Sequence, residues 1–210
     1  MVSKNDRKWE NRELADSDAI IACVTTIRRI VMTITKDKEG LRQILQIIYP
    51  IIVNSLTSDF DDTVDEVLDS VNIILYYAYD KQTRVPPELW QLLPRMYLLT
   101  AGKDEDMYGG HSPESINHVA VIVQNLINKD PQTLLAERDG EIETYLVMTN
   151  NFIQKFLLMN SQSNHKQDGV VVLRILISLL ENLPEQINHA MPNIVGVLLA
   201  EIKAAFSGKC

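Results

Sequence analysis

The sequence predicts an all-α protein in which helices pack in pairs and the pairs stack into a right-handed α-solenoid. Apolar residues recur at helical spacing along nearly the whole chain. Glycine and proline are few, with eight of each among 210 residues. No alternating run of apolar and polar residues stands between hairpin turns. Long helices joined by short connections account for these three observations.

Eight helices follow from this spacing. The first contains Ile20, Val24, Ile27, Val31 and Ile34, which share one face of a helix. Comparable apolar stripes recur in the later segments. The predicted helices cover residues 18–36, 41–57, 59–79, 87–101, 113–128, 142–159, 169–182 and 186–206.

Two of the helices have recognisable start signals. Ser58 and Asp61 form a variant of the capping box before the third helix. Ser112, Pro113 and Glu114 supply a cap, a first-turn proline and an acid before the fifth. The longest connection, GKDEDMYGGHS, ends at the same serine and predicts a polar surface loop.

Three prolines indicate how the helices are arranged. Pro94 follows Pro50 by 44 residues, and Pro192 follows Pro94 by 98, which is two further intervals of similar length. Each proline falls in the second helix of a predicted pair, where we expect it to bend the helix around the stack. A helical pair every 40 to 50 residues is typical of HEAT and armadillo repeats. The sequence therefore predicts about four HEAT-like helical pairs, although an ordinary helical bundle with prolines in register by chance remains an alternative.

Composition and charge limit the classes of function. The formal charge of −8 argues against nucleic acid as a direct partner and leaves basic proteins as candidates. No apolar stretch approaches the ~20 residues that a membrane span needs, and the start of the chain lacks an apolar signal core. The two cysteines, Cys23 and Cys210, do not suggest a structural disulfide. We expect an intracellular protein without membrane insertion.

Four segments resemble a known protein family: TSDFDDTVDEVLDSVNIILYY, PELWQLLPRMY, INKDPQTLLAERDGEIETYLVMTNNFIQKFL and AMPNIVGVLLAEI. They are similar to segments of nuclear import receptors of the importin-beta superfamily, with the closest likeness to the importin-seven and importin-eight class. The likeness is spread over about residues 18 to 205 and rests on the order of patterns. It departs from the family in the longer loop GKDEDMYGGHS and in the first twelve residues, which match nothing in it.

The resemblance implies a function in Ran-dependent transport of proteins between cytoplasm and nucleus. Receptors of this family are HEAT-repeat superhelices that bind protein cargo, phenylalanine-glycine nucleoporins at the nuclear pore complex, and Ran-GTP chiefly through their N-terminal repeats. By this likeness, residues 18–206 are a segment of a larger solenoid, with 1–17 as an unplaced N-terminal segment and 207–210 as a tail. A HEAT scaffold of another class, such as a phosphatase regulatory or chromosome-organising subunit, is the alternative.

An acidic strip is the sharpest local feature and the candidate protein-binding site. It consists of Asp62, Asp65, Glu66 and Asp69, which share one helical face opposite an apolar face. Acids in a first turn complement the helix dipole, and a charged face commonly just meets water. The functional interpretation is docking of basic cargo, because clustered charge raises encounter rates.

No motif for catalysis, metal or cofactor binding is present. The four histidines lack ligand spacing with one another or with a cysteine, and Gly109-Gly110 lacks the other parts of a phosphate loop. We therefore predict no enzyme activity and no cofactor, with an enzyme built on a helical core as the weakest alternative. Trp90 and Tyr97 lie on an apolar face and are predicted to be core residues and not an exposed aromatic groove.

Overall fold

The computed structural model describes residues 4–56, 61–101, 113–136, 144–160 and 168–188, with the single positions 192, 195, 196 and 199. Helices make up most of these ranges, and the described part holds no strand; Asp80 and Thr83 form an isolated bridge. The all-α prediction is confirmed. The helices are α1 (Lys4–Thr33), α2 (Lys38–Ser55), α3 (Asp61–Ala78), α4 (Pro87–Trp90), α5 (Leu93–Ala101), α6 (Pro113–Lys129), α7 (Pro131–Leu135), α8 (Tyr145–Asn160), α9 (Asp168–Asn182) and α10 (Pro184–Ile187).

Strongly periodic segments match the prediction well. The helices α3, α6 and α9 begin and end within two residues of the predicted bounds. The first helix begins earlier than predicted, since α1 runs unbroken from Lys4 through residue 17, and α7 was not predicted at all. Of the predicted helix 186–206, α10 covers only the start. The proposed capping box at Ser58 and the tail 207–210 lie outside the described residues.

The prediction of one helix over 87–101 was wrong. The structure has two helices there, because α4 ends at Trp90 and α5 begins at Leu93. Pro94 is therefore the second residue of α5, a position where an amide has no partner within the helix. Pro50 instead lies inside α2, where it leaves the carbonyl four residues earlier without its helical donor. The two prolines do not occupy equivalent positions, and only Pro50 is placed to bend a helix.

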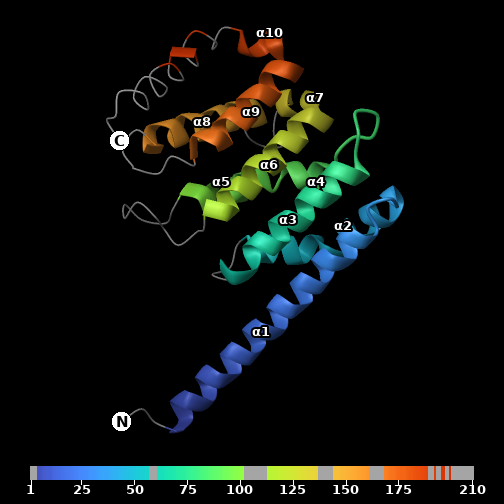
Figure 1. Cartoon of the computed structure of the whole chain (residues 1–210), viewed down its shortest axis with the longest axis vertical. Coiled ribbons are helices and arrows are strands. Elements are labelled where there is room, and N and C mark those ends of the chain that lie inside the picture. Colours follow the sequence, from blue (N-terminus) through green and yellow to red (C-terminus); the bar gives the residue numbers. More distant parts are fainter. Residues whose placement is uncertain are drawn as a thin grey trace.

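Four helices form a row in which each packs on the next, in the order α1, α3, α6 and α9 (Figure 1). Contacts between matching ends show that α3, α6 and α9 run in the same direction. Ser115, near the start of α6, donates to Asp65 near the start of α3 at 2.5 Å. At the other end, Lys129 of α6 donates to the Tyr76 carbonyl of α3 at 3.3 Å. Asn182 at the end of α9 donates to Asn128 of α6 at 2.8 Å.

The remaining long helices pack against members of this row. They pair as α2 with α3, α5 with α6, and α8 with α9. The α2–α3 pair is antiparallel, because Arg42 near the start of α2 donates to the Ala78 carbonyl at the end of α3 at 2.9 and 3.2 Å. The core lies between these helices and the row, and the face of α3 opposite the acidic strip is buried as predicted. That face comprises Val64, Val67, Leu68 and Val71.

The helix α2 has an N-terminal cap that the sequence reading missed. The Asp37 carboxylate accepts a hydrogen bond from the Gly40 amide at 2.9 Å. A Cβ on Gly40 would collide with that carboxylate. The cap and the glycine together explain why α2 begins at Lys38, three residues before the predicted start.

A turn built on Asp80 follows α3. One carboxylate oxygen accepts from the Gln82 and Thr83 amides, both at 3.0 Å, and the other accepts from Lys38 at 2.9 Å. The hydrogen bond from Lys38 is the largest cause that lowers the pKa of Asp80 from 3.8 to about 2, followed by the hydrogen bonds from Gln82 and Thr83. The turn thereby joins the start of α2 to the end of α3.

We expect the Asp80 carboxylate to make stability depend on pH in acid. A pKa lowered on folding means that the stabilisation is complete above 3.8 and is lost as pH falls through about 2. Urea unfolding between pH 5 and pH 2 should show a fall in stability that is shallower in Asp80→Asn. Equal slopes for the two proteins would contradict this role.

Candidate functional site

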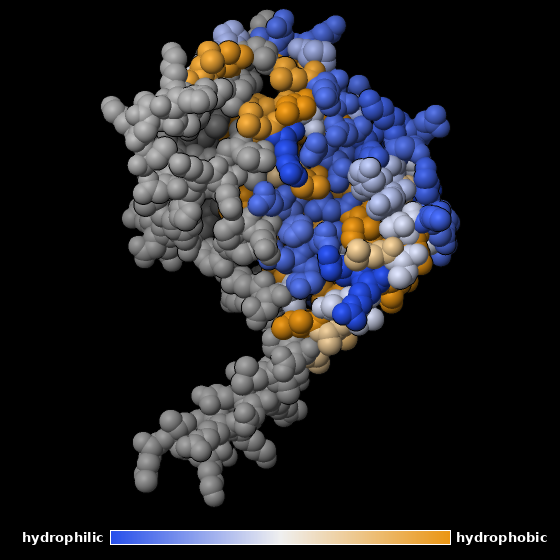
Figure 2. Space-filling model, viewed as in Figure 1, coloured by the Kyte–Doolittle hydropathy of each residue, from blue (hydrophilic) through white to orange (hydrophobic). Residues whose placement is uncertain are grey.

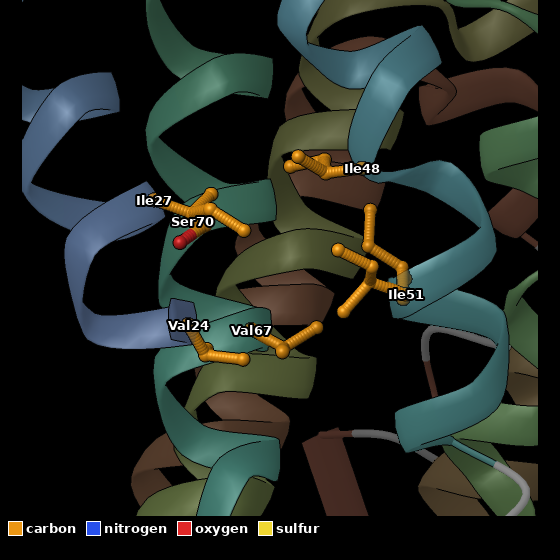
Figure 3. A pocket seen from close by; sticks show the side chains of 7 residues that line it. Val24, Ile27, Ile48, Ile51, Val67 and Ser70 are labelled. Carbon is orange, nitrogen blue, oxygen red and sulfur yellow. The ribbon is translucent and has the colours of Figure 1, made fainter. Parts of the chain in front are cut away.

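A groove lies between α1 and α2. Both helices pack on α3, which forms the floor of the groove (Figure 3). The lining side chains come from all three helices: Val24 and Ile27 from α1, Ile48, Ile51 and Ile52 from α2, and Val67 and Ser70 from α3.

The groove is chemically simple. Six of its seven lining residues are aliphatic, and the exception, Ser70, donates its hydroxyl to the Glu66 carbonyl within α3 at 2.8 Å. The groove is shallow and open to solvent, and it encloses far less space than the ~300–1,000 Å³ typical of small-molecule sites. The groove therefore offers a shallow apolar surface and no polar group for catalysis.

The rim of the groove is also apolar. Ile51 lines the groove and is 37% exposed, and Ile47, one turn earlier on α2, is 73% exposed. Ile47 and Ile51 lie one turn apart on the same helix, so they extend the apolar lining of the groove onto the surface of α2. They make α2 the side of the groove that a partner would meet.

The acidic strip lies at seams between helices. Asp69 pairs with Arg28 of α1, with 2.5 Å between its carboxylate and the guanidinium Nε. Asp65 accepts from Ser115 of α6. Two of the four acids thus join α3 to its neighbours in the row. This structural role could not be predicted from the charge pattern in the sequence. The side chain of Asp62 lies outside the described residues, and Glu66 is half-buried.

Docking of basic cargo on the strip stays a prediction. In the Arg28–Asp69 pair the arginine side chain is 39% exposed and the aspartate 23%. A partner would have to approach carboxylates that already have neighbours of opposite charge or donor character. The strip is accordingly a weaker candidate than the groove.

Trp90 and Tyr97 belong to the core, as predicted. Trp90 is 1% exposed and its ring centre lies 5.2 Å from that of Tyr145. The half-buried Tyr97 stacks on Phe152 at 4.4 Å. These contacts link the α4–α5 segment to α8 and exclude an exposed aromatic groove at this place.

A hydrogen bond accompanies the aromatic contacts. The hydroxyl groups of Tyr97 and Thr149 lie 3.0 Å apart, and Thr149 also donates to the Tyr145 carbonyl at 2.8 Å. Burial raises the pKa of Tyr97 well above its usual range, against a smaller lowering by the bond to Thr149. The phenol is therefore a structural hydrogen-bonding group and does not ionise at physiological pH.

The described residues contain no cluster of three or more side chains that could hold a metal ion. None of the helices searched there is both long and apolar enough to cross a membrane. Cys23 is exposed and unpaired with another cysteine. Of the four histidines only His118 lies in the described ranges, where its carbonyl accepts from Asn72 of α3 at 3.2 Å.

Comparisons of the chain with models of protein families, with curated proteins and with solved structures find no match. The function proposed for this chain rests on the row of helices and on the groove at its N-terminal end.

Proposed function

We propose that this chain is a non-catalytic segment of a nuclear import receptor of the importin-beta superfamily, built as a right-handed α-solenoid of about four HEAT-like pairs. It would bind protein cargo and phenylalanine-glycine nucleoporins in Ran-dependent transport between cytoplasm and nucleus, with Ran-GTP bound through repeats largely outside this segment. The chain has no cofactor in this proposal. Its partners are proteins, and neither nucleic acid nor a membrane is among them.

The observation that carries the proposal is the row of parallel helices. Stacking of α3, α6 and α9 in one direction, each with a second helix packed beside it, is what repeated helical pairs produce. The order of the chain follows the order of the row (Figure 1). A closed bundle would instead bring the first and last helices together around one core.

The groove supports a binding function for the same segment. Its aliphatic lining and the exposed Ile47 and Ile51 beside it would let a phenylalanine ring of a flexible peptide pack onto this surface. Such binding needs no polar recognition beyond the peptide backbone, which fits a groove whose one hydroxyl is already bonded within its own helix. The acidic surface of a chain with charge −8 would add attraction for basic cargo.

We expect Ile51→Asp to abolish binding of a phenylalanine-glycine peptide to this chain. The substitution places a charge in the apolar groove at a position that is already 37% exposed, so folding should tolerate it. Leu98→Asp is the matched control, since Leu98 is 72% exposed on α5 and lies outside the groove. Fluorescence anisotropy with a labelled peptide should show at least about a tenfold loss for Ile51→Asp, equivalent to ~1.4 kcal/mol.

Two results would count against the proposal in different ways. Equal binding by the wild type and Ile51→Asp would remove the groove as the peptide site. Failure of the full-length protein to release bound cargo on addition of Ran-GTP in a pull-down would remove the transport function itself. In that case a HEAT scaffold outside transport is the remaining candidate.

A further inference from the structure

The outward face of α9, at the C-terminal end of the row, is apolar. This helix buries Ile175, Leu176, Ser178 and Leu179 on the side that meets α6 and α8. On the opposite side Leu173, Ile177 and Leu180 follow one another at spacings of one helical turn. They are 39%, 50% and 37% exposed. Figure 2 shows apolar atoms gathered at this end of the molecule, over α9 and α10.

The other end of the row differs. α1 buries Val24 and Val31 against the row, and its outward face carries small or polar side chains over the part whose side chains are described. Ile30 and Met32 are exposed too, but they lie on the flanks of the helix. The outward positions are Ala22, Thr26, Arg29 and Thr33, all exposed. The two end faces of the row therefore differ, because the described outward positions of α1 are small or polar and those of α9 are apolar.

Charged residues beside the α9 stripe are arranged for self-recognition. Arg174 and Glu181 are both exposed and lie two helical turns apart on the same flank of the stripe. A two-fold axis at the level between Ile177 and Ser178 would pair two copies of α9 in antiparallel fashion. Each Arg174 then faces the Glu181 of the other copy, and the three apolar side chains of each copy meet at the centre. Self-complementarity of this kind is what a two-fold interface requires.

We propose that two copies of this chain dimerise through antiparallel pairing of their α9 helices. Leu173, Ile177 and Leu180 form the apolar centre of the interface, and two Arg174–Glu181 ion pairs set its register on one flank. The inference does not use the groove, which lies at the other end of the row. It concerns this 210-residue chain, because in a longer solenoid a following repeat would cover the same face of α9.

Sedimentation equilibrium on the 210-residue chain tests the proposal. We expect the wild type to reach twice the mass of one chain at high concentration and Ile177→Glu to remain at the mass of one chain. Ile47→Glu is the control, because Ile47 is 73% exposed on α2 and should leave the dimer intact. Far-UV circular dichroism confirms that each variant is folded.

Charge exchange tests the register. Arg174→Glu alone should weaken the dimer by about tenfold, because both ion pairs become repulsive. The double variant Arg174→Glu/Glu181→Arg should restore the wild-type dissociation constant to within about threefold. A wild type that stays monomeric, a wild type that forms open-ended oligomers, or a double variant no better than the single one would each overturn the proposal.

Discussion

Replacement of Trp90 by alanine is expected to lower the free energy of unfolding by about 3–5 kcal/mol. Trp90 is among the largest fully buried side chains of the described residues and packs against Tyr145 of α8. Removing the indole leaves a cavity at the junction between α4 and α8 that the surrounding helices cannot close completely. For a domain with a typical stability of about 5–15 kcal/mol, this is a large fraction of the total.

Trp90→Phe is the matched control for that measurement. The indole Nε1 is buried and has no hydrogen-bond partner, so phenylalanine removes an unpaired donor while it keeps most of the aromatic volume. Its loss of stability in urea unfolding should be clearly smaller than that of Trp90→Ala. An alanine variant within about 1 kcal/mol of the wild type would show that this junction does not support the fold.

Replacement of Pro50 by alanine should raise the free energy of unfolding by about 2–2.5 kcal/mol. Proline inside a helix is less favourable than alanine by about 3 kcal/mol, because it lacks the amide and its ring meets the preceding turn. Part of that gain is offset by about 0.4–1 kcal/mol, since alanine leaves the unfolded chain freer. Pro50 is exposed within α2, so alanine meets no crowding there.

Pro94→Ala is the contrasting variant. Pro94 is the second residue of α5, where no helical hydrogen bond is missing, and alanine should lower stability by about 0.4–1 kcal/mol through the unfolded state. Guanidinium or urea unfolding of the two variants beside the wild type measures both effects. A destabilised Pro50→Ala would mean that the bend in α2 is needed for its packing on α3.

These two prolines show which helix bounds could be predicted from apolar spacing and which could not. Apolar spacing predicted the bounds of α3, α6 and α9 to within two residues. A continuous apolar stripe at helical spacing can be buried on one side only if the whole segment is helical. The segment from 87 to 101 carries the same kind of stripe, so spacing alone predicts one helix that includes Pro94. Proline has no backbone N–H to donate within a helix, and the segment forms two helices, α4 and α5.

The candidate site was less accessible to the sequence than the fold. The acidic strip was visible as a charge pattern, but its partners Arg28 and Ser115 lie 41 and 50 residues away from the aspartates that they contact. The groove has no local signal, since its lining comes from three helices and reads as ordinary core. The aromatic contacts of Trp90 and Tyr97 with α8 likewise join distant segments.

By itself the sequence determined the helical class, the extent of the strongly periodic helices and the burial of residues such as Val67 and Trp90. Each of these features depends on local spacing and on the transfer of apolar side chains out of water. Only the tertiary structure decided which acids pair with neighbouring helices, where the groove opens, and which end of the row presents an apolar face. Those features depend on how far one helix lies from the next, and that distance is set by packing between residues that are remote in the chain.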